Sequence, residues 1–247
     1  MHCLCCRQGN QISPLVSPFG GAEARLATNP YTCGLPGVAS DGGPLVLDFA
    51  TSMVANGKVM NYANKGTKFD DNVLLTADGV ATNDPSAMWT QQTGGAGSRQ
   101  GGLDSQGGSL MPFGLHKGSG LALMCALLAG GLSGGGTEQP RRQQGPGPIL
   151  NHLFGVFVDP AAVEKAGGAT VAEMLEEMKS FIEYYKSSRP IDPEHPVLAP
   201  GEPERAAMAE RKANGIAIAA HTWGTLSGTA KRVGVAQSVI DATVRAS

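Results

Sequence analysis

The sequence of 247 residues is poor in charge, because Asp, Glu, Lys and Arg together make up 16% of it, against about a quarter in a typical soluble domain. The 19 Lys and Arg do not outnumber the 21 Asp and Glu, so the basic excess of a nucleic-acid-binding surface is lacking. The sequence also has no long apolar run of the kind that a membrane-spanning helix needs, which is about 18 or more consecutive apolar residues. We therefore expect neither nucleic acid nor a membrane as a partner.

Glycine, by contrast, is abundant, with 35 Gly and 16 Pro in the chain. The glycines follow no three-residue period, which excludes a collagen-like helix. The chain is long enough for one large domain or two modest ones with a buried core. We therefore expect a globular protein rich in loops.

Cysteine is scarce and unevenly placed: Cys3, Cys5 and Cys6 stand near the start, and Cys33 and Cys125 follow singly. A structural zinc site usually needs two spaced ligand pairs, so no metal site is expected. An odd number of cysteines argues against a disulfide framework, and the start of the chain lacks the basic and long apolar regions of a signal peptide. A reducing compartment, the cytoplasm, is the expected location.

Strand and helix patterns are intermixed without a repeating strand–helix unit, which predicts an α+β fold. Strands are expected over 44–50, 73–79 and 151–160, the first of them buried. Helices are expected over 121–132, 170–186, 204–213 and 226–246, and a turn or short helix through 53–55 with Thr51 or Ser52 as its cap. The helix over 121–132 is apolar on every face and is expected to be deeply buried, whereas 170–186 is amphipathic and begins at a Thr cap.

This pattern divides the chain into three parts. Residues 1–12 form an atypical start in which no strand is expected, 13–160 an α+β domain, and 161–247 a helical region with a Pro-rich linker at 190–203. Gly-rich loops are expected over 90–110 and 133–148.

Neither common nucleotide motif is present, since G-x-G-x-x-G after a strand and G-x-x-x-x-G-K-[ST] are both absent. Three polar clusters at element boundaries remain as candidates for chemistry. They are Thr28-Asn29-Pro30, Asp48 with 51–58, and the segment 114–118 that contains His116 and Lys117. Each also has an ordinary interpretation: a turn for the first, a helix cap with a solvated lysine for the second, and a capping His with an exposed Lys for the third. The third is the most suggestive, because the start of a helix attracts anions and Lys117 adds a positive charge.

Five segments in order resemble the malate/L-lactate dehydrogenase family, most closely its hydroxycarboxylate dehydrogenase branch. They are LATNPY (26–31), LDFATSMVANGKV (47–59), DGVATNDP (78–85), GLHKGSGLALMCALLAGGLSGG (114–135) and LAPGEPE (198–204). The resemblance implies a non-Rossmann mixed sheet with packed helices that binds NAD or NADP, followed by a C-terminal helical segment. It also implies a homodimer that transfers a hydride between the nicotinamide and a small 2-keto or 2-hydroxy acid such as malate or lactate.

The resemblance also assigns roles to individual positions. As substrate contacts it implies Thr28, Asn56 and Gly57. As cofactor contacts it implies Asp48, Phe49 and Ala50 at a strand end, His116 and Lys117 before the apolar helix, and Pro200, Gly201 and Glu202 at the opening of a loop.

One family motif is missing from the sequence. Family members carry Ser-His-Gly in an N-terminal helical part, where the His is the acid/base, and no Ser-His-Gly occurs among the 247 residues. Reduction of a ketone needs a proton donor, whose loss costs about 10²–10⁴-fold in rate. His116 is the candidate substitute. The expectation is therefore a truncated chain, and three alternatives stay open: an active oxidoreductase or a fragment of one, a catalytically inactive nicotinamide-binding or subunit-interaction remnant, and a purely structural protein.

Overall fold

The computed structural model describes residues 2–10, 14–39, 42–88, 107–139 and 150–243, and for 2–10, 150 and 221 it describes the backbone alone. These residues form two compact units, the first ending at Ser187 and the second beginning at Ser188. The division into 1–12, 13–160 and 161–247 stays a prediction, and the loops expected over 90–110 and 133–148 fall largely outside the described residues.

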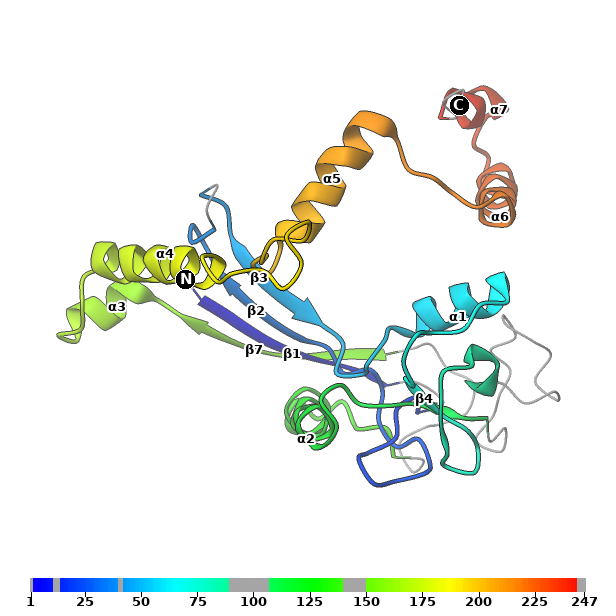
Figure 1. Ribbon diagram of the computed structural model, residues 1–247, viewed down its shortest axis with the longest axis horizontal. Coiled ribbons are helices and arrows are strands. Elements are labelled where there is room, and N and C mark those ends of the chain that lie inside the picture. Colours follow the sequence, from blue (N-terminus) through cyan, green and yellow to red (C-terminus); the bar gives the residue numbers. More distant parts are fainter. Residues whose placement is uncertain (1, 11–13, 40–41, 89–106, 140–149, 244–247) are drawn as a thin grey trace. The chain divides into compact units, whose positions relative to one another are not determined.

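A four-stranded antiparallel sheet is the main sheet of the first unit, in the order β3-β2-β1-β7 (Figure 1). Its strands are β1 (His2–Asn10), β2 (Tyr31–Leu35), β3 (Leu45–Phe49) and β7 (Leu150–Val158). The prediction that the first dozen residues hold no strand is wrong, because β1 pairs with β7 along its whole length and with β2 on its other side. Its run of His, Cys and Gln lacks the apolar alternation by which a strand is recognised, so the pairing partners determine its conformation.

The first predicted strand is confirmed as β3, but its predicted burial is wrong. Among the described strands β3 pairs with β2 alone and lies at an edge of the sheet, where Val46 is 38% and Leu47 40% exposed. An apolar run of this length cannot tell a central strand from an edge strand. The expected mixed sheet also differs, since the named strands that the structure describes pair antiparallel and one isolated parallel bridge joins Val16 to Leu110.

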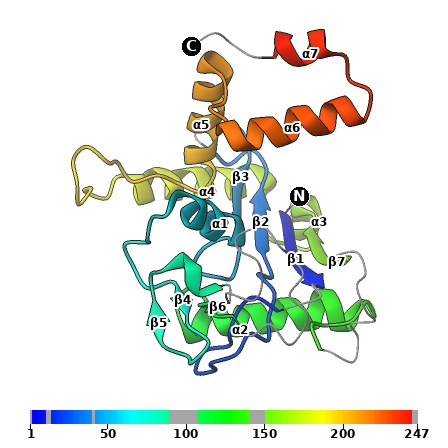
Figure 2. The same cartoon turned by 90° about the vertical axis from the view of Figure 1, so that its right-hand side faces the viewer.

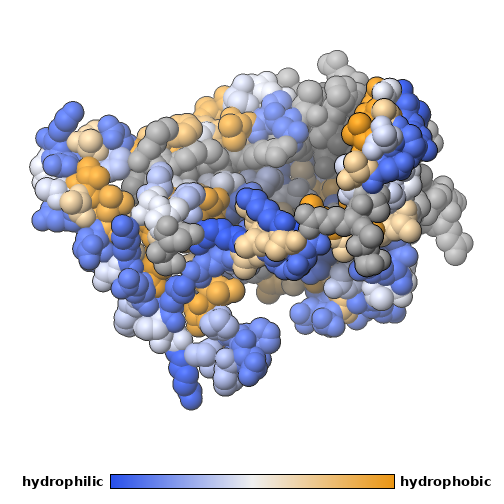
Figure 3. All heavy atoms as spheres, turned by 90° about the horizontal axis from the view of Figure 1, so that it is seen from above, coloured by the Kyte–Doolittle hydropathy of each residue, from blue (hydrophilic) through white to orange (hydrophobic). Residues whose placement is uncertain are grey.

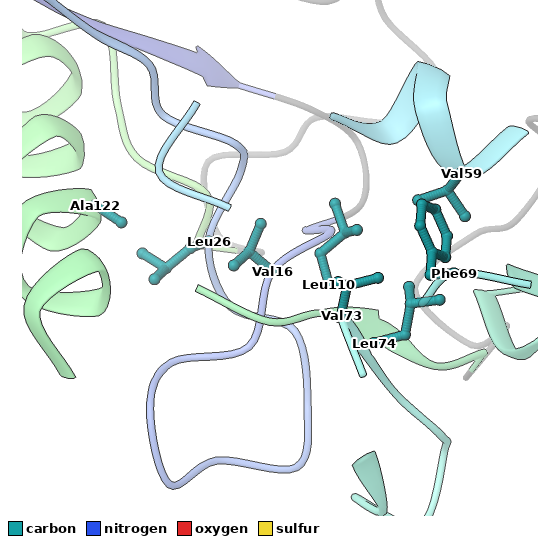
Figure 4. Packing of buried hydrophobic residues seen from close by; sticks show 8 residues of the cluster. All are labelled: Val16, Leu26, Val59, Phe69, Val73, Leu74, Leu110 and Ala122. Atoms are coloured by element: carbon teal, nitrogen blue, oxygen red, sulfur yellow. The ribbon is translucent and has the colours of Figure 1, made fainter. Parts of the chain in front are cut away.

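A smaller sheet, in the order β5-β4-β6, consists of β4 (Leu74–Leu75), β5 (Ala81–Thr82) and β6 (Ser109–Leu110). The strand expected over 73–79 with its Asp-Gly turn is confirmed, because the Thr76 N–H donates to the Val80 carbonyl oxygen at 2.8 Å across the turn. This sheet packs with α1 (Asn56–Lys65) and the 3-10 turn η1 (Pro85–Met88). Figure 4 shows the buried core that results, formed by Val16, Leu26, Val59, Phe69, Val73, Leu74, Leu110 and Ala122.

The apolar helix is α2 (His116–Cys125), continued by the π-helical segment η3 (Ala126–Leu132), and it lies against one face of the larger sheet (Figures 1 and 2). Small residues face the sheet, where Cys125 and Ala129 pack with Tyr31 and Phe154. The predicted deep burial is wrong, because large side chains on the other face are exposed: Leu123 51%, Met124 48%, Leu127 48% and Leu132 69%.

Two further helices follow β7 in the first unit. Asp159 caps α3 (Pro160–Lys165), so the predicted stop of the strand at Asp-Pro is confirmed. The helix expected over 170–186 is α4 (Val171–Lys186), and its predicted cap is confirmed as a capping box between Thr170 and Glu173. The Thr170 hydroxyl and backbone N–H both donate to the Glu173 carboxylate, which lowers the pKa of Glu173.

The second unit holds α5 (Glu202–Asn214), α6 (Ala220–Arg232) and α7 (Gln237–Ala242). The helix over 204–213 is confirmed, whereas the single helix expected over 226–246 is wrong. A turn at Val233–Gly234 separates α6 from α7, and Gly234 has φ +84°, a left-handed conformation that glycine adopts readily.

The exposed face in Figure 3 shows hydrophobic residues, in orange, interspersed with hydrophilic ones, in blue. Among the described residues, no helix is long and apolar enough to cross a membrane.

Candidate functional site

Three of the segments singled out in the sequence lie side by side in the first unit, joined by backbone hydrogen bonds. The Thr51 N–H donates to the Thr28 carbonyl oxygen at 2.9 Å, and the Phe113 N–H donates to the Thr51 carbonyl oxygen at 3.1 Å. The structure therefore brings together Thr28, the end of β3 that carries Asp48, Phe49 and Ala50, and the turn that precedes His116.

Aromatic rings join the same three segments. The Phe49 ring lies 5.7 Å from the Tyr31 ring and 5.2 Å, edge to face, from the Phe113 ring, measured between centroids. All three side chains are half-buried. Phe49 thus supplies an apolar contact between the end of the sheet and the segment that leads into α2.

Asp48 presents its carboxylate on the exposed edge strand. Its Oδ1 accepts a hydrogen bond of 2.7 Å from the hydroxyl of Thr32, the residue opposite it on β2. This bond fixes the orientation of an exposed carboxylate, which can accept hydrogen bonds from ligand hydroxyl groups.

Asn56 and Gly57 are the first two residues of α1, Asn56 half-buried and Gly57 exposed. A turn or short helix was expected through 53–55 with Thr51 or Ser52 as its cap, and the structure has bends at 53 and 54 and no helix there. The Thr51 hydroxyl is engaged by the carbonyl oxygens of Thr28 and Asn29, and the Ser52 hydroxyl donates to the Val54 carbonyl oxygen at 2.8 Å. α1 begins only at Asn56, and its N-cap is Ala55, which makes no side-chain capping bond.

His116 and Lys117 are the first residues of α2, and both are exposed. The turn before them is strained, because Leu115, a non-glycine residue, has φ +57° and ψ −118°. The His116 ring meets the Phe19 ring edge-on at 5.9 Å. The start of a ten-residue helix beside a lysine carries a positive potential, so this segment fits an anionic group such as a phosphate.

Gly118 lets α2 approach this turn closely. A Cβ at this position would lie 1.9 Å from the Phe113 carbonyl oxygen, so that only glycine fits without a shift. The glycine in the predicted motif therefore has a packing role, which positions the first turn of α2 against Phe113.

Pro200, Gly201 and Glu202 belong to the second unit. They differ from the expected opening of a loop, because Gly201 is the N-cap of α5 and Glu202 is its first residue. The Glu202 carboxylate accepts a hydrogen bond of 2.8 Å from the Ala199 N–H, which stabilises this helix start.

Sequence reasoning missed Glu138, a carboxylate that is only 4% exposed. It lies in a stretch rich in Gly, Gln and Pro, whose composition signals only a loop. Glu138 and His116 also line a cavity of about 930 Å³ beside α2, together with Phe19, Arg25, Ser119 and Leu123 among others.

A metal site is not found where it can be assessed: the described side chains contain no group of three or more His, Cys, Asp or Glu that could hold an ion. The side chains of Cys3, Cys5 and Cys6 are not among those described, and neither Cys33 nor Cys125 forms a disulfide.

Comparison with known proteins identifies the family. The family profile for malate/L-lactate dehydrogenase matches residues 3–227. The chain is 34% identical over 230 residues to hydroxycarboxylate dehydrogenase B of Escherichia coli (strain K12), covering 93% of this chain and 57% of that protein. It is 35% identical over 224 residues to the L-lactate dehydrogenase of Cupriavidus necator, covering 91% of this chain and 58% of that protein.

A solved structure shows the same likeness in three dimensions. The structure of a candidate malate/lactate dehydrogenase from E. coli superposes with a TM-score of 0.78 at 31% identity, covering 98% of this chain and 62% of that one. The chain thus spans somewhat more than half the length of the relatives that it matches. Because the profile match covers nearly the whole sequence, this chain belongs to the malate/L-lactate dehydrogenase family.

Proposed function

We propose that this chain binds NAD or NADP and serves hydride transfer between the nicotinamide and a small 2-keto or 2-hydroxy acid. The observation that supports this most is the convergence of the Thr28, Asp48 and Phe113 segments in front of an exposed, positively charged helix start. Relatives named hydroxycarboxylate dehydrogenase and L-lactate dehydrogenase point to the same chemistry.

The proposed cofactor contacts follow from the chemistry of each group. Lys117 and the first turn of α2 would hold a cofactor phosphate, and the Asp48 carboxylate, oriented by Thr32, would accept ribose hydroxyls. Phe49 and Ala50 would contact the cofactor from the same strand end, and His116 from the start of α2. Pro200, Gly201 and Glu202 are proposed as further cofactor-binding residues.

For the substrate we propose contacts from Thr28, Asn56 and Gly57. The bound nicotinamide would supply the hydride, and a 2-keto acid also needs a proton at its carbonyl oxygen. His116, exposed at the wall of the cavity, is the proposed donor of that proton.

Three further features belong to the same proposal. The cofactor would bind to a non-Rossmann fold, which the antiparallel pairing of the named strands supports. A homodimer is proposed because α2 and η3 leave Leu123, Met124, Leu127 and Leu132 exposed, and light scattering on the purified protein measures its mass. Residence in the cytoplasm is proposed because Cys33 carries a free thiol, as cysteines do in a reducing compartment.

Cofactor binding is tested by titrating NADH and NADPH into purified protein and following fluorescence. Lys117→Ala is expected to weaken binding about tenfold, as a charged hydrogen bond to a phosphate is worth roughly 1.5–3 kcal/mol. Lys165→Ala, which removes an exposed lysine at the end of α3, is the matched control and should leave the affinity unchanged. Equal affinities for the two variants would refute the assignment of Lys117.

Catalysis is tested by NADH-dependent reduction of pyruvate, oxaloacetate and hydroxyphenylpyruvate. Turnover that falls at least a hundredfold in His116→Gln would support His116 as the proton donor. Tight NADH binding without turnover of any of these acids would instead identify an inactive nucleotide-binding chain.

A further inference from the structure

Buried polar groups connect the three converging segments, those of Thr28, Asp48 and Phe113. Glu138 is the first residue in this series of contacts. Glu138 Oε1 accepts hydrogen bonds from the Ala27 N–H at 3.1 Å and from Asn29 Nδ2 at 3.0 Å. The carboxylate is 4% exposed, and its partners lie about 110 residues away in the sequence. A buried carboxylate is retained only where hydrogen bonds compensate its desolvation, so these bonds hold the 27–29 segment firmly.

Asn29 passes this constraint to α2. Its side chain is fully buried, and Nδ2 donates a second hydrogen bond, of 3.1 Å, to the Ala122 carbonyl oxygen in that helix. Two costs accompany the arrangement: Asn29 has φ +32°, and its Oδ1 has no hydrogen-bond partner among the described groups. A residue that keeps a strained backbone and an unpaired buried oxygen is fixed by its surroundings, and such residues concentrate at functional sites.

Thr51 completes the connection to the candidate site. Its fully buried hydroxyl donates toward the carbonyl oxygens of Thr28 and Asn29, at 2.9 and 3.0 Å. Its own carbonyl oxygen accepts from the Phe113 N–H, which leads into the turn before His116. A continuous path of hydrogen bonds therefore runs from Glu138 through Asn29 and Thr51 to all three segments.

We propose that Glu138 is a positioning residue, which through Asn29 and Thr51 holds Thr28, the end of β3 and the start of α2 in the arrangement that binds the cofactor. The inference rests on the proposed function, since it assigns a remote carboxylate to the cofactor-binding site. Glu138 touches neither substrate nor cofactor in this role. It acts by keeping the binding groups in register before the ligand arrives.

Backbone hydrogen exchange tests the positioning independently of cofactor binding. In Glu138→Ala we expect faster exchange in peptides covering 27–31, 48–53 and 113–117, because the path loses its first member. Glu138→Gln keeps an acceptor oxygen at the same place and should restore slow exchange. Ser109→Ala is the matched control, since it removes a buried side-chain hydrogen bond of the same unit, the 2.5 Å bond to Ser17, outside the path. The inference would be overturned if faster exchange in Glu138→Ala were confined to residues around 138. It would also be overturned if Glu138→Ala and Ser109→Ala showed equal exchange rates in the three segments.

NADH affinity supplies the second measurement. Glu138→Ala should raise the NADH dissociation constant about tenfold, while Glu138→Gln and Ser109→Ala stay within about threefold of the unmodified protein. If Glu138→Ala does not fold, Thr51→Val takes its place, with Thr51→Ser as the variant that retains the hydroxyl. Unchanged NADH affinity in a variant that exchanges fast at the three segments would overturn the inference. If the unmodified protein does not bind NADH, the proposed function is refuted, and the hydrogen-exchange result alone decides whether Glu138 positions the three segments.

Discussion

Replacement of Gly118 by alanine tests whether the close approach between α2 and Phe113 positions the candidate site. The new Cβ would lie 1.9 Å from the Phe113 carbonyl oxygen and 2.7 Å from its Cδ1, where real Cβ atoms do not come within 3.0 Å. The first turn of α2 must therefore move away from Phe113 by about 1 Å. This shift strains the Phe113 N–H bond to Thr51 and the contact of the Phe113 ring with Phe49.

The size of the effect follows from two opposing terms. Insertion of a methyl group into a packed site typically costs about 1–3 kcal/mol, and alanine offsets this by up to ~1 kcal/mol through its higher helix propensity. The expected net loss is about 1–2 kcal/mol. For a chain of this size each 1 kcal/mol lowers the melting temperature by about 2–4 °C.

Gly120, two residues further in the same helix, provides the control. A Cβ at Gly120 meets nothing within 4 Å, so Gly120→Ala should stabilise the protein or leave it unchanged. Thermal unfolding and NADH titration of the two variants measure both consequences. If Gly118→Ala melts no lower than Gly120→Ala and binds NADH as well, the packing argument for this glycine is wrong.

Three further predictions concern single contacts. Thr170→Ala should destabilise the protein by about 1 kcal/mol, because α4 loses its capping box, and Thr170→Ser should restore most of the loss in thermal unfolding. Hydrogen bonds from the Ser86 hydroxyl and N–H, aided by Lys68, lower the pKa of Asp84 to about 2. The stabilisation by the Asp84 carboxylate is therefore complete above the ordinary carboxyl pKa near 4 and is lost as the pH falls through 2. In acid titrations the difference in unfolding free energy between the unmodified protein and Asp84→Asn should shrink over that pH range, and a constant difference would contradict this. Thr32→Val should free the Asp48 carboxylate from its 2.7 Å hydrogen bond and weaken NADH binding several-fold in fluorescence titrations, without the loss of melting temperature that a packing defect would cause.

Local signals in the sequence predicted those elements that local interactions determine. The amphipathic spacing and Thr170 cap of α4, the Asp-Pro stop after β7 and the Asp-Gly turn after β4 all have their causes within a few residues. The identity of β1 as a strand depends on partners more than 20 residues away, and the position of β3 at a sheet edge depends on which strands pair with β2. A window of ten residues contains no information about which strands pair or which side chains such pairing buries.

The same distinction applies to the candidate site. Thr28, Asp48 and His116 could be singled out because each stands in a recognisable motif at an element boundary. Glu138 could not, since its partners Ala27 and Asn29 are distant in sequence and its own surroundings have the composition of an ordinary loop. A single buried carboxylate gives no periodic or compositional signal.

The apolar helix shows why burial was overestimated. Its residues are apolar on every side, but the face that packs on the larger sheet is the one that carries Cys125 and Ala129, while Ala122 packs in the core with Val16 and Leu26. Cys125 and Ala129 let the helix lie close to the strands, with Leu121 and Leu128 half-buried beside them, whereas Leu123, Met124, Leu127 and Leu132 are exposed. The residues that hold α2 in place are thus different from those that dominate its hydropathy, and the hydrogen bond from Asn29 to Ala122 belongs to the first set. It follows that substitutions at Leu123 or Met124 should disturb the candidate site less than a substitution at Asn29, although both positions are far more hydrophobic.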